Sequence, residues 1–531
     1  MYCIWVPVLG NSIPIPVQRL LSGIASHESG DDEVLLCIDF AINPDAESAS
    51  RSWMETQDDM SYSILRFRDD PDDSCDLVLS SKVREGYDLA WRRHYVLAAS
   101  VASPVEGITS NELHQLLAGN VLEGKNSSFA VFSGISADLS RTLDMGVGIR
   151  TIDQIPEELT DDPTLVAIIP FESLTTGIRE IAIDEMSLLN GTALESYPLI
   201  EEVWVNEGRF SGLYHIVAHQ RGEVQYHPES VVSVVVTGTS VIGARKLYLK
   251  SVETQDWLYP WRHVVDVLRN ATVAHISNES SFLPDCEQNH WTLVFCGPDA
   301  AFDGLTWAGV DVVGLTGNHI LDYGADAFIH TLDLYDAAGI LYFGGGRDNA
   351  DAHKPAVVEL DSVSIAFLGF GMIPPVAYHA NEARPGSAEF DAESMQQAIA
   401  EIRDEVDYIF VDMQWGPEYE RYPDETQIRY GRMAIDAGAD FVHGVHSHWI
   451  QPVEEYNGGI IFYGLGNFLF DQTWSRDTRE GVMIRHYFYD GSYLGYEPIP
   501  TFISDEIRPD IAVGDDSVRI RNYLFLEAQS Q

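Results

Sequence analysis

Apolar runs rich in Val, Ile, Leu and Phe alternate with amphipathic stretches along most of this chain. In the first half, runs of the length of buried strands lie at 34–40, 77–81, 94–101, 128–134 and 165–171. Among them, SNELHQLLAG at 110–119 predicts a helix with Ser110 as its N-cap and Gly119 as its stop. This alternation of strands and helices predicts an α/β fold with a mixed or parallel sheet.

The second half continues the alternation over a longer stretch. Strands are predicted at 233–238, 273–278, 311–317, 339–345, 364–370, 407–413, 440–444 and 459–468. Helices are predicted at 327–339, 393–405 and 425–438, the last ending on Gly438. Crossovers of this kind predict a two-sheet α/β sandwich covered by helices. A seam near 224–232 predicts two domains, at 1–228 and 229–531.

The net charge of the chain excludes some classes of binding partner. Asp and Glu number 82 against 32 Lys and Arg, which gives a formal net charge of -50. Such a surface repels nucleic acid and anionic membrane surfaces, so neither is a predicted partner. Two interpretations of the excess stay open: a solvated acidic coat, or a role in cation binding. No run of 18 apolar residues is present, so no transmembrane segment is predicted.

The N-terminal stretch and the cysteines are the features of the sequence that indicate whether the protein is exported. The stretch at 1–18 is apolar but lacks a basic n-region and contains three prolines, so it is a poor signal peptide and is interpreted as the first strand of a domain. None of the five cysteines forms a CxxC pair, so no structural zinc site is predicted. Cys286 and Cys296 bracket a short loop. They are expected to form a disulfide if the protein is exported, and to be two buried thiols otherwise.

The most informative stretch is DVVGLTGNHILDYG at 311–324. Its apolar strand ends in Gly317, Asn318 and His319, with Asp322 three residues later. Sites in α/β sheets lie at the carboxyl edge of the strands, so this strand end is expected to supply ligands or an acid.

Three other strand ends in the same half also carry polar groups, namely Gly238-Thr239-Ser240, Asn278-Glu279 and His446-Ser447-His448. Carboxylate, amide and imidazole groups that converge from separate strands form the usual shell of a dinuclear metal site, in which two metals clamp a phosphate and polarise water. The spacing His-x-His suits ligation of one ion.

Each of these residues also has a simpler interpretation. His319 is then a hydrogen-bonded core histidine with Asp322 as its partner, and Asn318 is only a turn residue. His446 and His448 are then histidines of a surface loop, Glu279 is a solvated loop acid, and Asn467 belongs to a packing turn.

Five motifs follow one another in the second half, namely TGNHILDYG (316–324), AGILYFGGG (338–346), MQWGPEY (413–419), AIDAGADFVHGVHSHWIQPVE (434–454) and GLGNFLFDQ (464–472). On these motifs, residues 230–475 resemble the CapA family, which is linked to poly-γ-glutamate capsule synthesis and has a calcineurin-like metallophosphatase fold. The resemblance implies a metallophosphatase-like sandwich in the second half, with metal-assisted hydrolysis or transfer as the reaction if the site is active.

The chain departs from the family pattern at two ligand positions. Members usually have Gly-Asp where this chain has Gly238-Thr239, and His-Trp-Gly where it has Gln414-Trp415-Gly416. Thr is a poor metal ligand and Gln a weaker one than His. The remaining set predicts one divalent ion of unspecified identity rather than two.

Roles follow from the resemblance and from the residue types. His319 is assigned as general acid or phosphate contact, with Asp322 orienting it. The predicted metal ligands are Glu279, Asn318, His446 and His448. The predicted substrate-binding residues are Asn278, Gln414, Glu418 and Asn467.

The first half resembles type 2 periplasmic substrate-binding domains on the segments 94–120, 165–174 and 196–200. This likeness implies an α/β periplasmic-binding-like domain with either a ligand cleft or only a scaffold role. For the whole chain we expect a role in synthesis or handling of an anionic surface polymer, in an extracellular or cell-envelope location. The alternative is a non-catalytic protein that binds a small solute or a polymer.

Overall fold

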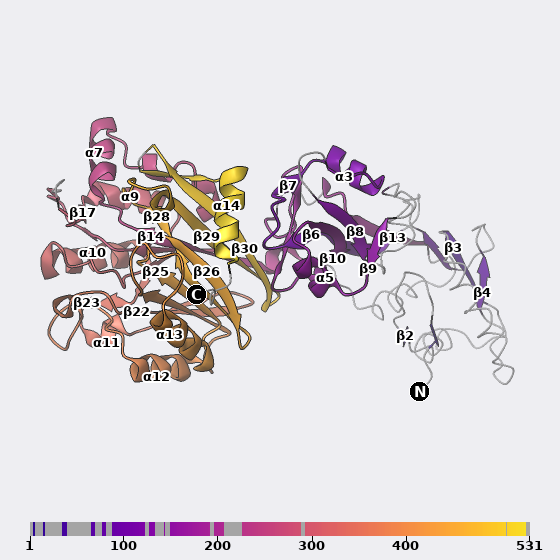
Figure 1. Cartoon of the computed structure of the whole chain (residues 1–531). Coiled ribbons are helices and arrows are strands. Elements are labelled where there is room, and N and C mark those ends of the chain that lie inside the picture. Colours follow the sequence, from indigo (N-terminus) through magenta and orange to yellow (C-terminus); the bar gives the residue numbers. More distant parts are fainter. Residues whose placement is uncertain are drawn as a thin grey trace. The chain divides into compact units, whose positions relative to one another are not determined.

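The computed structural model divides the chain into two compact units, Met1–Pro228 and Glu229–Gln531. It describes residues 88–122, 127–132, 143, 149–191, 196–206, 226–287, 292–505 and 507–526, and the backbone of short strands at 4–5, 14–15, 34–39, 65–68 and 77–80. Most of the N-terminal stretch that was interpreted as a first strand lies outside the described residues. Within it, Ile4–Trp5 (β1) pairs with Pro14–Ile15 (β2). Figure 1 shows both units.

A nine-stranded mixed sheet dominates the N-terminal unit, in the order β4-β3-β5-β13-β6-β10-β8-β9, with β11 also paired to β6. Its strands are β3 (Val34–Asp39), β4 (Leu65–Arg68), β5 (Leu77–Ser80), β6 (Asp88–Ser100), β8 (Ser128–Phe132), β9 (Arg150–Ile152), β10 (Leu165–Pro170), β11 (Ile178–Glu180) and β13 (Ile200–Asn206). The remaining elements are β7 (Gly107–Ile108), β12 (Ala182–Ile183), α3 (Ser110–Leu117), α5 (Ile155–Asp161) and the 3₁₀ turn η1 (Phe171–Ser173).

Helix α3 starts one residue earlier than the sequence suggested. Its N-cap is Thr109, not Ser110, because the Thr109 side chain accepts from the backbone N–H of Glu112 while the Glu112 carboxylate accepts from the backbone N–H of Thr109. This reciprocal capping box outcompetes the neighbouring hydroxyl, which donates instead to Asp184. Gly119 follows the helix with φ of 81°, as a helix stop requires.

Two sheets make up the C-terminal unit. The first has eight strands in the order β19-β18-β15-β14-β29-β30-β31, with β28 paired to β14. These strands are β14 (Val231–Ser240), β15 (Val273–Asn278), β18 (Val312–Gly314), β19 (Leu341–Phe343), β28 (Asn467–Leu469), β29 (Glu480–Tyr489), β30 (Ser492–Ser504) and β31 (Arg508–Ile511). Strands β14, β15, β18 and β19 run parallel, so their carboxyl ends share one edge.

The second sheet has six strands in the order β21-β22-β24-β25-β27-β26. They are β21 (Ala356–Glu359), β22 (Ser364–Gly371), β24 (Tyr408–Gln414), β25 (Phe441–Val445), β26 (Ile450–Tyr456) and β27 (Gly459–Leu465). Strands β22, β24, β25 and β27 are parallel. The small strands are β16 (Ser281–Phe282), β17 (Cys296–Gly297), β20 (Gly345–Gly346) and β23 (Gly386–Ser387).

Helices cover the outer faces of both sheets (Figure 1). They are α7 (Arg245–Thr254), α8 (Val265–Arg269), α9 (Asp299–Trp307), α10 (Gly324–Ala338), α12 (Ala392–Ile402) and α13 (Glu425–Asp436). Helix α11 (Asn349–Ala352) contacts β20 and β23, and helix α14 (Asp515–Leu524) contacts β26 of one sheet and β30 of the other. The 3₁₀ turns are η3 (Pro228–Ser230), η4 (Tyr259–Trp261), η5 (Val376–Tyr378) and η6 (Asp477–Arg479). One apolar core joins the first sheet to α7, α8, α9 and α10, and another joins the second sheet to α12 and α13. The unit is therefore layered helix, sheet, sheet, helix.

The space between the two sheets is aromatic and polar. His275 on β15 stacks on Phe367 of β22 and lies 3.0 Å from the carboxylate of Asp412 on β24. His443 on β25 and His486 on β29 meet through their Nε2 atoms at 3.1 Å. All four polar groups are fully buried, so this interior holds ionisable side chains directly beneath the sheet edge that carries the predicted site.

The predicted α/β class and the two-sheet sandwich of the second half are confirmed. The likeness of the first half to periplasmic substrate-binding domains stays a prediction. Strands β29, β30 and β31 and helix α14 were not predicted, because residues after 468 lack a long uninterrupted apolar run. Within the described residues, no helix combines the length and hydrophobicity needed to cross a membrane.

Candidate functional site

The polar side chains predicted at strand ends lie at the carboxyl edge of the two sheets in the C-terminal unit. In the first sheet, β15 leads into Glu279, and the chain after β18 turns at Asn318. In the second sheet, β24 ends on Gln414, and β25 leads into His446. Because parallel strands bring their carboxyl ends to one edge, residues separated by more than 100 positions meet there.

Gln414 is the centre of this cluster. Its amide nitrogen lies 2.9 Å from Oε1 of Glu279, 2.9 Å from Oδ1 of Asn318 and 3.3 Å from Nδ1 of His446. An amide group carries two hydrogens, so three acceptors compete for two donors. All three acceptors are atoms of predicted metal ligands. The Gln414 amide therefore occupies the point at which a cation would satisfy the same three ligands.

Glu279 is not a solvated loop acid, since only 1% of it is exposed. Burial raises the pKa of its carboxyl group, while His319 and the hydrogen bond from Gln414 oppose that rise. Its second oxygen, Oε2, is buried without a hydrogen-bond partner among the described residues. Gly317 makes this placement possible, because a Cβ atom at that position would lie 2.6 Å from Cγ of Glu279.

A second group of ligands lies beside the first. One ligand atom each of Glu418, His446 and His448 lies within 4.8 Å of the others, an arrangement that could hold a metal ion. Both histidines are buried, at 5% and 4% exposure, so they are not surface-loop histidines. Glu418 is exposed and opens the group to solvent. The sequence assigned Glu418 to substrate binding, whereas the structure places it with the two histidines.

The imidazole of His448 is held in a form that suits metal ligation. Its Nδ1 lies 2.8 Å from Oδ1 of Asn467, an acceptor, so Nδ1 carries the hydrogen and Nε2 keeps its lone pair. Nε2 is also the atom that lies 3.8 Å from the Glu418 carboxylate. Burial, followed by the charge of His446, lowers the pKa of His448 to about 3. Burial, followed by His319, lowers the pKa of His446 to about 4. Both rings are therefore neutral at pH 7, as metal binding requires.

The backbone at this group is strained. Tyr419, His446 and His448 have φ values of 63°, 88° and 56°, in the left-handed region that residues with a side chain rarely adopt. Each such residue costs on the order of 1–3 kcal/mol and persists only where its surroundings enforce it. Here the backbone N–H of Tyr419 donates to the carbonyl of Ser447, which ties the two strained turns together.

His319 and Asp322 form the predicted pair. Nδ1 of His319 lies 2.8 Å from Oδ2 of Asp322. Burial lowers the pKa of His319, but the hydrogen bond to Asp322 and the charges of Glu279 and Glu418 outweigh it, so the net shift is upward. The interpretation as a hydrogen-bonded histidine and the interpretation as a proton donor share this geometry, and the raised pKa favours a protonated ring.

Two residues named from the strand ends support the cluster without joining it. Thr239, which stands where the family pattern has Asp, accepts a hydrogen bond of 3.2 Å from the backbone N–H of His446. Asn278 donates to the carbonyl of Ser280 and to the hydroxyl of Tyr335 on α10. The side chain of Asn278 is thus committed to the core beneath the site.

An aromatic border next to the ligand group was not predicted. The Tyr419 ring stacks on His448 at a centroid distance of 5.8 Å and meets Trp449 and Trp474 edge-on. Trp474 is 58% exposed, unusual for a side chain so large. The only signal in the sequence was its place two residues after GLGNFLFDQ, in a loop that contacts the site.

The residues fit one divalent cation better than two. Glu418, His446 and His448 supply one carboxylate and two neutral imidazoles, a donor set that suits a transition metal or zinc. The other position, between Glu279 and Asn318, already receives the Gln414 amide.

Comparison with known proteins gives the family of this region. Residues 222–472 match the model of the bacterial capsule synthesis protein PGA_cap. The match ends at the last motif of the predicted CapA resemblance and includes every site residue predicted from the sequence, so that resemblance is confirmed.

Two curated relatives are similar over the same region. The chain is 27% identical over 274 residues to the capsule biosynthesis protein CapA of Bacillus anthracis, covering 50% of this chain and 66% of that protein. It is 33% identical over 195 residues to the PGA biosynthesis protein CapA of Bacillus subtilis strain 168, covering 36% of this chain and 51% of that protein. The matched part spans about half to two thirds of the length of these relatives.

Among solved structures, the calcineurin-like phosphoesterase YfkN from Bacillus subtilis is similar at 13% sequence identity with a TM-score of 0.32. The similarity covers 55% of this chain and 95% of that one.

Proposed function

Because residues 222–472 carry the domain of the bacterial capsule synthesis proteins, we propose that this protein acts in the synthesis or handling of an anionic surface polymer of the poly-γ-glutamate class. The C-terminal unit binds one divalent cation through Glu418, His446 and His448. When bound, this cation polarises a carbonyl or phosphoryl oxygen of the substrate. The protein works outside the cytoplasm, in the cell envelope or beyond it.

The observation that supports this proposal most is the ligand group at the sheet edge. Three ligand atoms lie within 4.8 Å, both imidazoles are neutral, and two of the three residues have strained backbones. Strain of this kind clusters at functional sites, where it fixes the geometry in advance.

His319 is the group we assign to proton donation. Its bond to Asp322 fixes the ring, and its raised pKa keeps a larger share of the ring protonated near neutral pH. Glu279 and Asn318 hold the Gln414 amide and thereby form the floor of the site.

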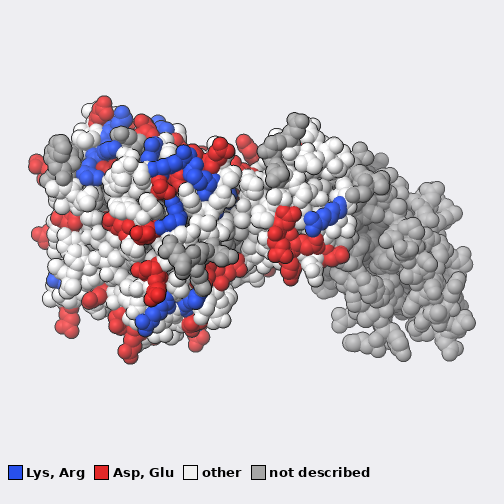
Figure 2. Space-filling view, in the orientation of Figure 1, with Lys and Arg blue, Asp and Glu red and all other residues white. Residues whose placement is uncertain are grey.

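The negative charge of the protein suggests a second role for the cation, which is to offset the repulsion of an anionic polymer. Figure 2 shows acidic side chains over the visible face, with lysines and arginines mostly beside them. Several arginines of the C-terminal unit are already paired with carboxylates, for example Arg476 and Arg519 with Asp516. A polyanion is repelled by a chain of net charge -50, so a bound cation that contacts its carboxylates offsets that repulsion at the site.

A non-catalytic role as a polymer-binding protein is the second candidate. The observation that favours it is the Gln414 amide, which fills the position a second cation would need. A site with one cation binds an anion without the paired metals that clamp both oxygens of a displacement.

The test uses the purified full-length protein, stripped of metal and reloaded with Mn²⁺ or Zn²⁺. Metal content is measured by mass spectrometry, and the chain length of added poly-γ-glutamate is followed by size-exclusion chromatography. We expect close to one ion per chain and a metal-dependent shortening of the polymer. Glu418→Gln should lose both, whereas the matched exposed variant Glu420→Gln should keep both.

Each outcome decides between the proposals. Metal-dependent binding of the polymer without shortening supports the non-catalytic role. Neither binding nor shortening, with the ion bound, contradicts the polymer function. Failure to bind any ion contradicts the assignment of the metal site.

A further inference from the structure

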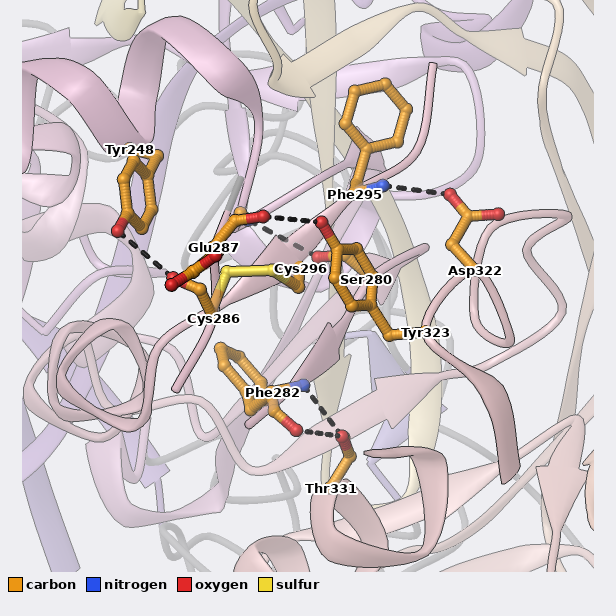
Figure 3. Close-up of a disulfide and its surroundings, with 11 residues drawn as sticks. Tyr248, Ser280, Phe282, Cys286, Glu287, Phe295, Cys296, Asp322, Tyr323 and Thr331 are labelled. Atoms are coloured by element: carbon orange, nitrogen blue, oxygen red, sulfur yellow. Dashed lines mark hydrogen bonds between the residues drawn. A yellow bond between two sulfur atoms is a disulfide. The ribbon is translucent and has the colours of Figure 1, made fainter. Parts of the chain in front are cut away.

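The segment that carries the disulfide lies directly against the His319–Asp322 pair. Cys286 and Cys296 are bonded, with Cα atoms 5.9 Å apart and ten residues of sequence separation. Both are buried. Cys296 is on β17, which pairs with β16, and Phe282 of β16 donates its backbone N–H to the Thr331 hydroxyl on α10. Strand β16 and helix α10 therefore anchor the disulfide in the C-terminal unit (Figure 3).

Phe295, the residue before Cys296, contacts both members of the pair. Its backbone N–H donates to Oδ2 of Asp322 at 2.9 Å, the same oxygen that bonds Nδ1 of His319. Its ring meets the His319 ring edge-on, with centroids 4.7 Å apart. Phe295 is fully buried. One residue thus holds the carboxylate by its backbone and the imidazole by its side chain.

The other end of the disulfide segment touches the same turn. The hydroxyl of Tyr323, next to Asp322, donates to the carbonyl of Glu287 at 2.9 Å. The hydroxyl of Tyr248 on α7 donates to the carbonyl of Cys286 at 3.1 Å. Figure 3 shows these contacts on either side of the sulfur–sulfur bond.

The Phe295 ring also reaches toward the metal ligands. It packs edge-on against Phe470, which in turn contacts the ring of His448. The guanidinium of Arg245, paired with Asp471, lies over the Phe295 ring. Phe295 therefore links the His319–Asp322 pair to the wall of the ligand group.

We propose that Phe295 is a positioning residue for His319, and that the Cys286–Cys296 disulfide holds Phe295 in place. The orientation of the His319 ring then depends on the oxidised state of this disulfide. A dithiol reductant supplies two electrons and two protons, gives two thiols at Cys286 and Cys296, and is itself oxidised to a disulfide. This inference deepens the proposed function, since it gives the same site a dependence on the redox state of its compartment.

The test reads the His319 ring directly and does not need enzymatic activity. Full-length protein is labelled with ¹³C at Cε1 of histidine, and the His319 signal is assigned by its loss in His319→Gln. The edge-on Phe295 ring shifts that signal by its ring current. We expect the signal to move on reduction with dithiothreitol, in Cys286→Ser/Cys296→Ser and in Phe295→Leu. The signals of His263 and His443 should stay in place.

A milder change guards against misfolding of the core variants. Tyr323→Phe removes only the hydroxyl that bonds Glu287, and we expect a smaller shift of the same signal. Phe295→Tyr keeps an aromatic ring, so its His319 signal should lie much closer to the wild-type chemical shift than that of Phe295→Leu does. An unchanged His319 signal after complete reduction, with thiols at both positions verified by mass spectrometry, would overturn the inference. Because the readout is a chemical shift, that result leaves the polymer function untouched.

Discussion

The side-chain amide of Gln414 donates a hydrogen bond of 2.9 Å to Oε1 of Glu279, across 135 residues of sequence. Glu279 is buried, and its carboxyl group has a raised pKa because burial penalises the charged form. The carboxylate faces an uncharged donor, which supplies one hydrogen bond and no net charge.

The first prediction replaces that donor by an acceptor of the same shape. Gln414→Glu places a second carboxylate against Glu279 and Asn318, so the folded state should lose on the order of 1–3 kcal/mol in the absence of metal. A divalent cation should restore the loss, because its two positive charges then offset the two carboxylates at 414 and 279. Thermal unfolding with EDTA and with Mn²⁺ measures both effects.

Gln414→Leu is the control for that experiment, since it removes the donor without adding an acceptor. It should lower the melting temperature with and without metal alike. If Gln414→Glu responds to Mn²⁺ no more than the wild type does, the amide does not occupy a cation position.

The second prediction concerns the ligand group. His448→Ala removes a neutral imidazole whose Nε2 faces Glu418, so divalent metal affinity should fall at least tenfold. Asn467→Ala should weaken affinity less, because it removes only the acceptor that fixes the His448 ring. Calorimetric titration of metal-free protein measures both constants. Equal affinity in wild type and His448→Ala would place the metal elsewhere.

Residues of the candidate site could be predicted from the sequence wherever a polar motif directly follows an apolar strand. The run from Val312 to Thr316 is uninterrupted, and the Gly-Asn-His that follows has to emerge at the sheet edge. The same reasoning identified Glu279 and His446. Strand ends are local features, and a parallel sheet brings them together without further information.

What the sequence did not predict depends on contacts between distant residues. The substitution at Gln414 was visible, but its three acceptors come from three other strand ends. Glu418 lies in a loop in which Gly416 has a φ of 75° and the backbone N–H of Tyr419 donates to the carbonyl of Ser447, between the two histidines. Strand β29 was missed because it buries Arg485 and His486, which interrupt its apolar pattern.

The third prediction tests the close approach beneath Asn318. Gly317→Ala would place a Cβ atom 2.6–2.8 Å from Cα, Cβ and Cγ of Glu279. The backbone of one strand end has to shift, at a cost of about 1–3 kcal/mol. The free energy of metal binding at Glu418, His446 and His448 should change less than the free energy of unfolding, because the nearest atoms to the added methyl group all belong to Glu279. Gly107→Ala is the control, because that glycine has no left-handed backbone and a Cβ atom there would meet only the carbonyl oxygen of Ala182, at an ordinary contact distance of 3.5 Å. A wild-type melting temperature in Gly317→Ala would contradict the geometry.

The last prediction concerns acid stability and the histidines between the sheets. Burial lowers the pKa of His486 to about 3, and burial together with the charges of His486 and His275 lowers the pKa of His443. Groups that face His486 are Nε2 of His443 and the hydroxyl of Tyr493, with the Phe410 ring edge-on.

The sign follows from proton binding. Between a pH of about 6.5, the ordinary histidine value, and about 3, the unfolded chain binds a proton at this position that the folded chain does not. Stability is therefore full above pH 6.5 and falls on acidification through that window. One such histidine contributes a slope of up to about 1.4 kcal/mol per pH unit.

His486→Gln cannot titrate and still offers a donor and an acceptor to His443 and Tyr493. The free energy of unfolding, measured by urea titration from pH 7 to pH 4, should therefore fall less steeply in His486→Gln than in wild type. His114→Gln, at an exposed histidine on helix α3, is the matched control for the loss of a histidine. Equal slopes in wild type and His486→Gln would show that His486 takes up its proton without unfolding, and that the space between the sheets admits a charge.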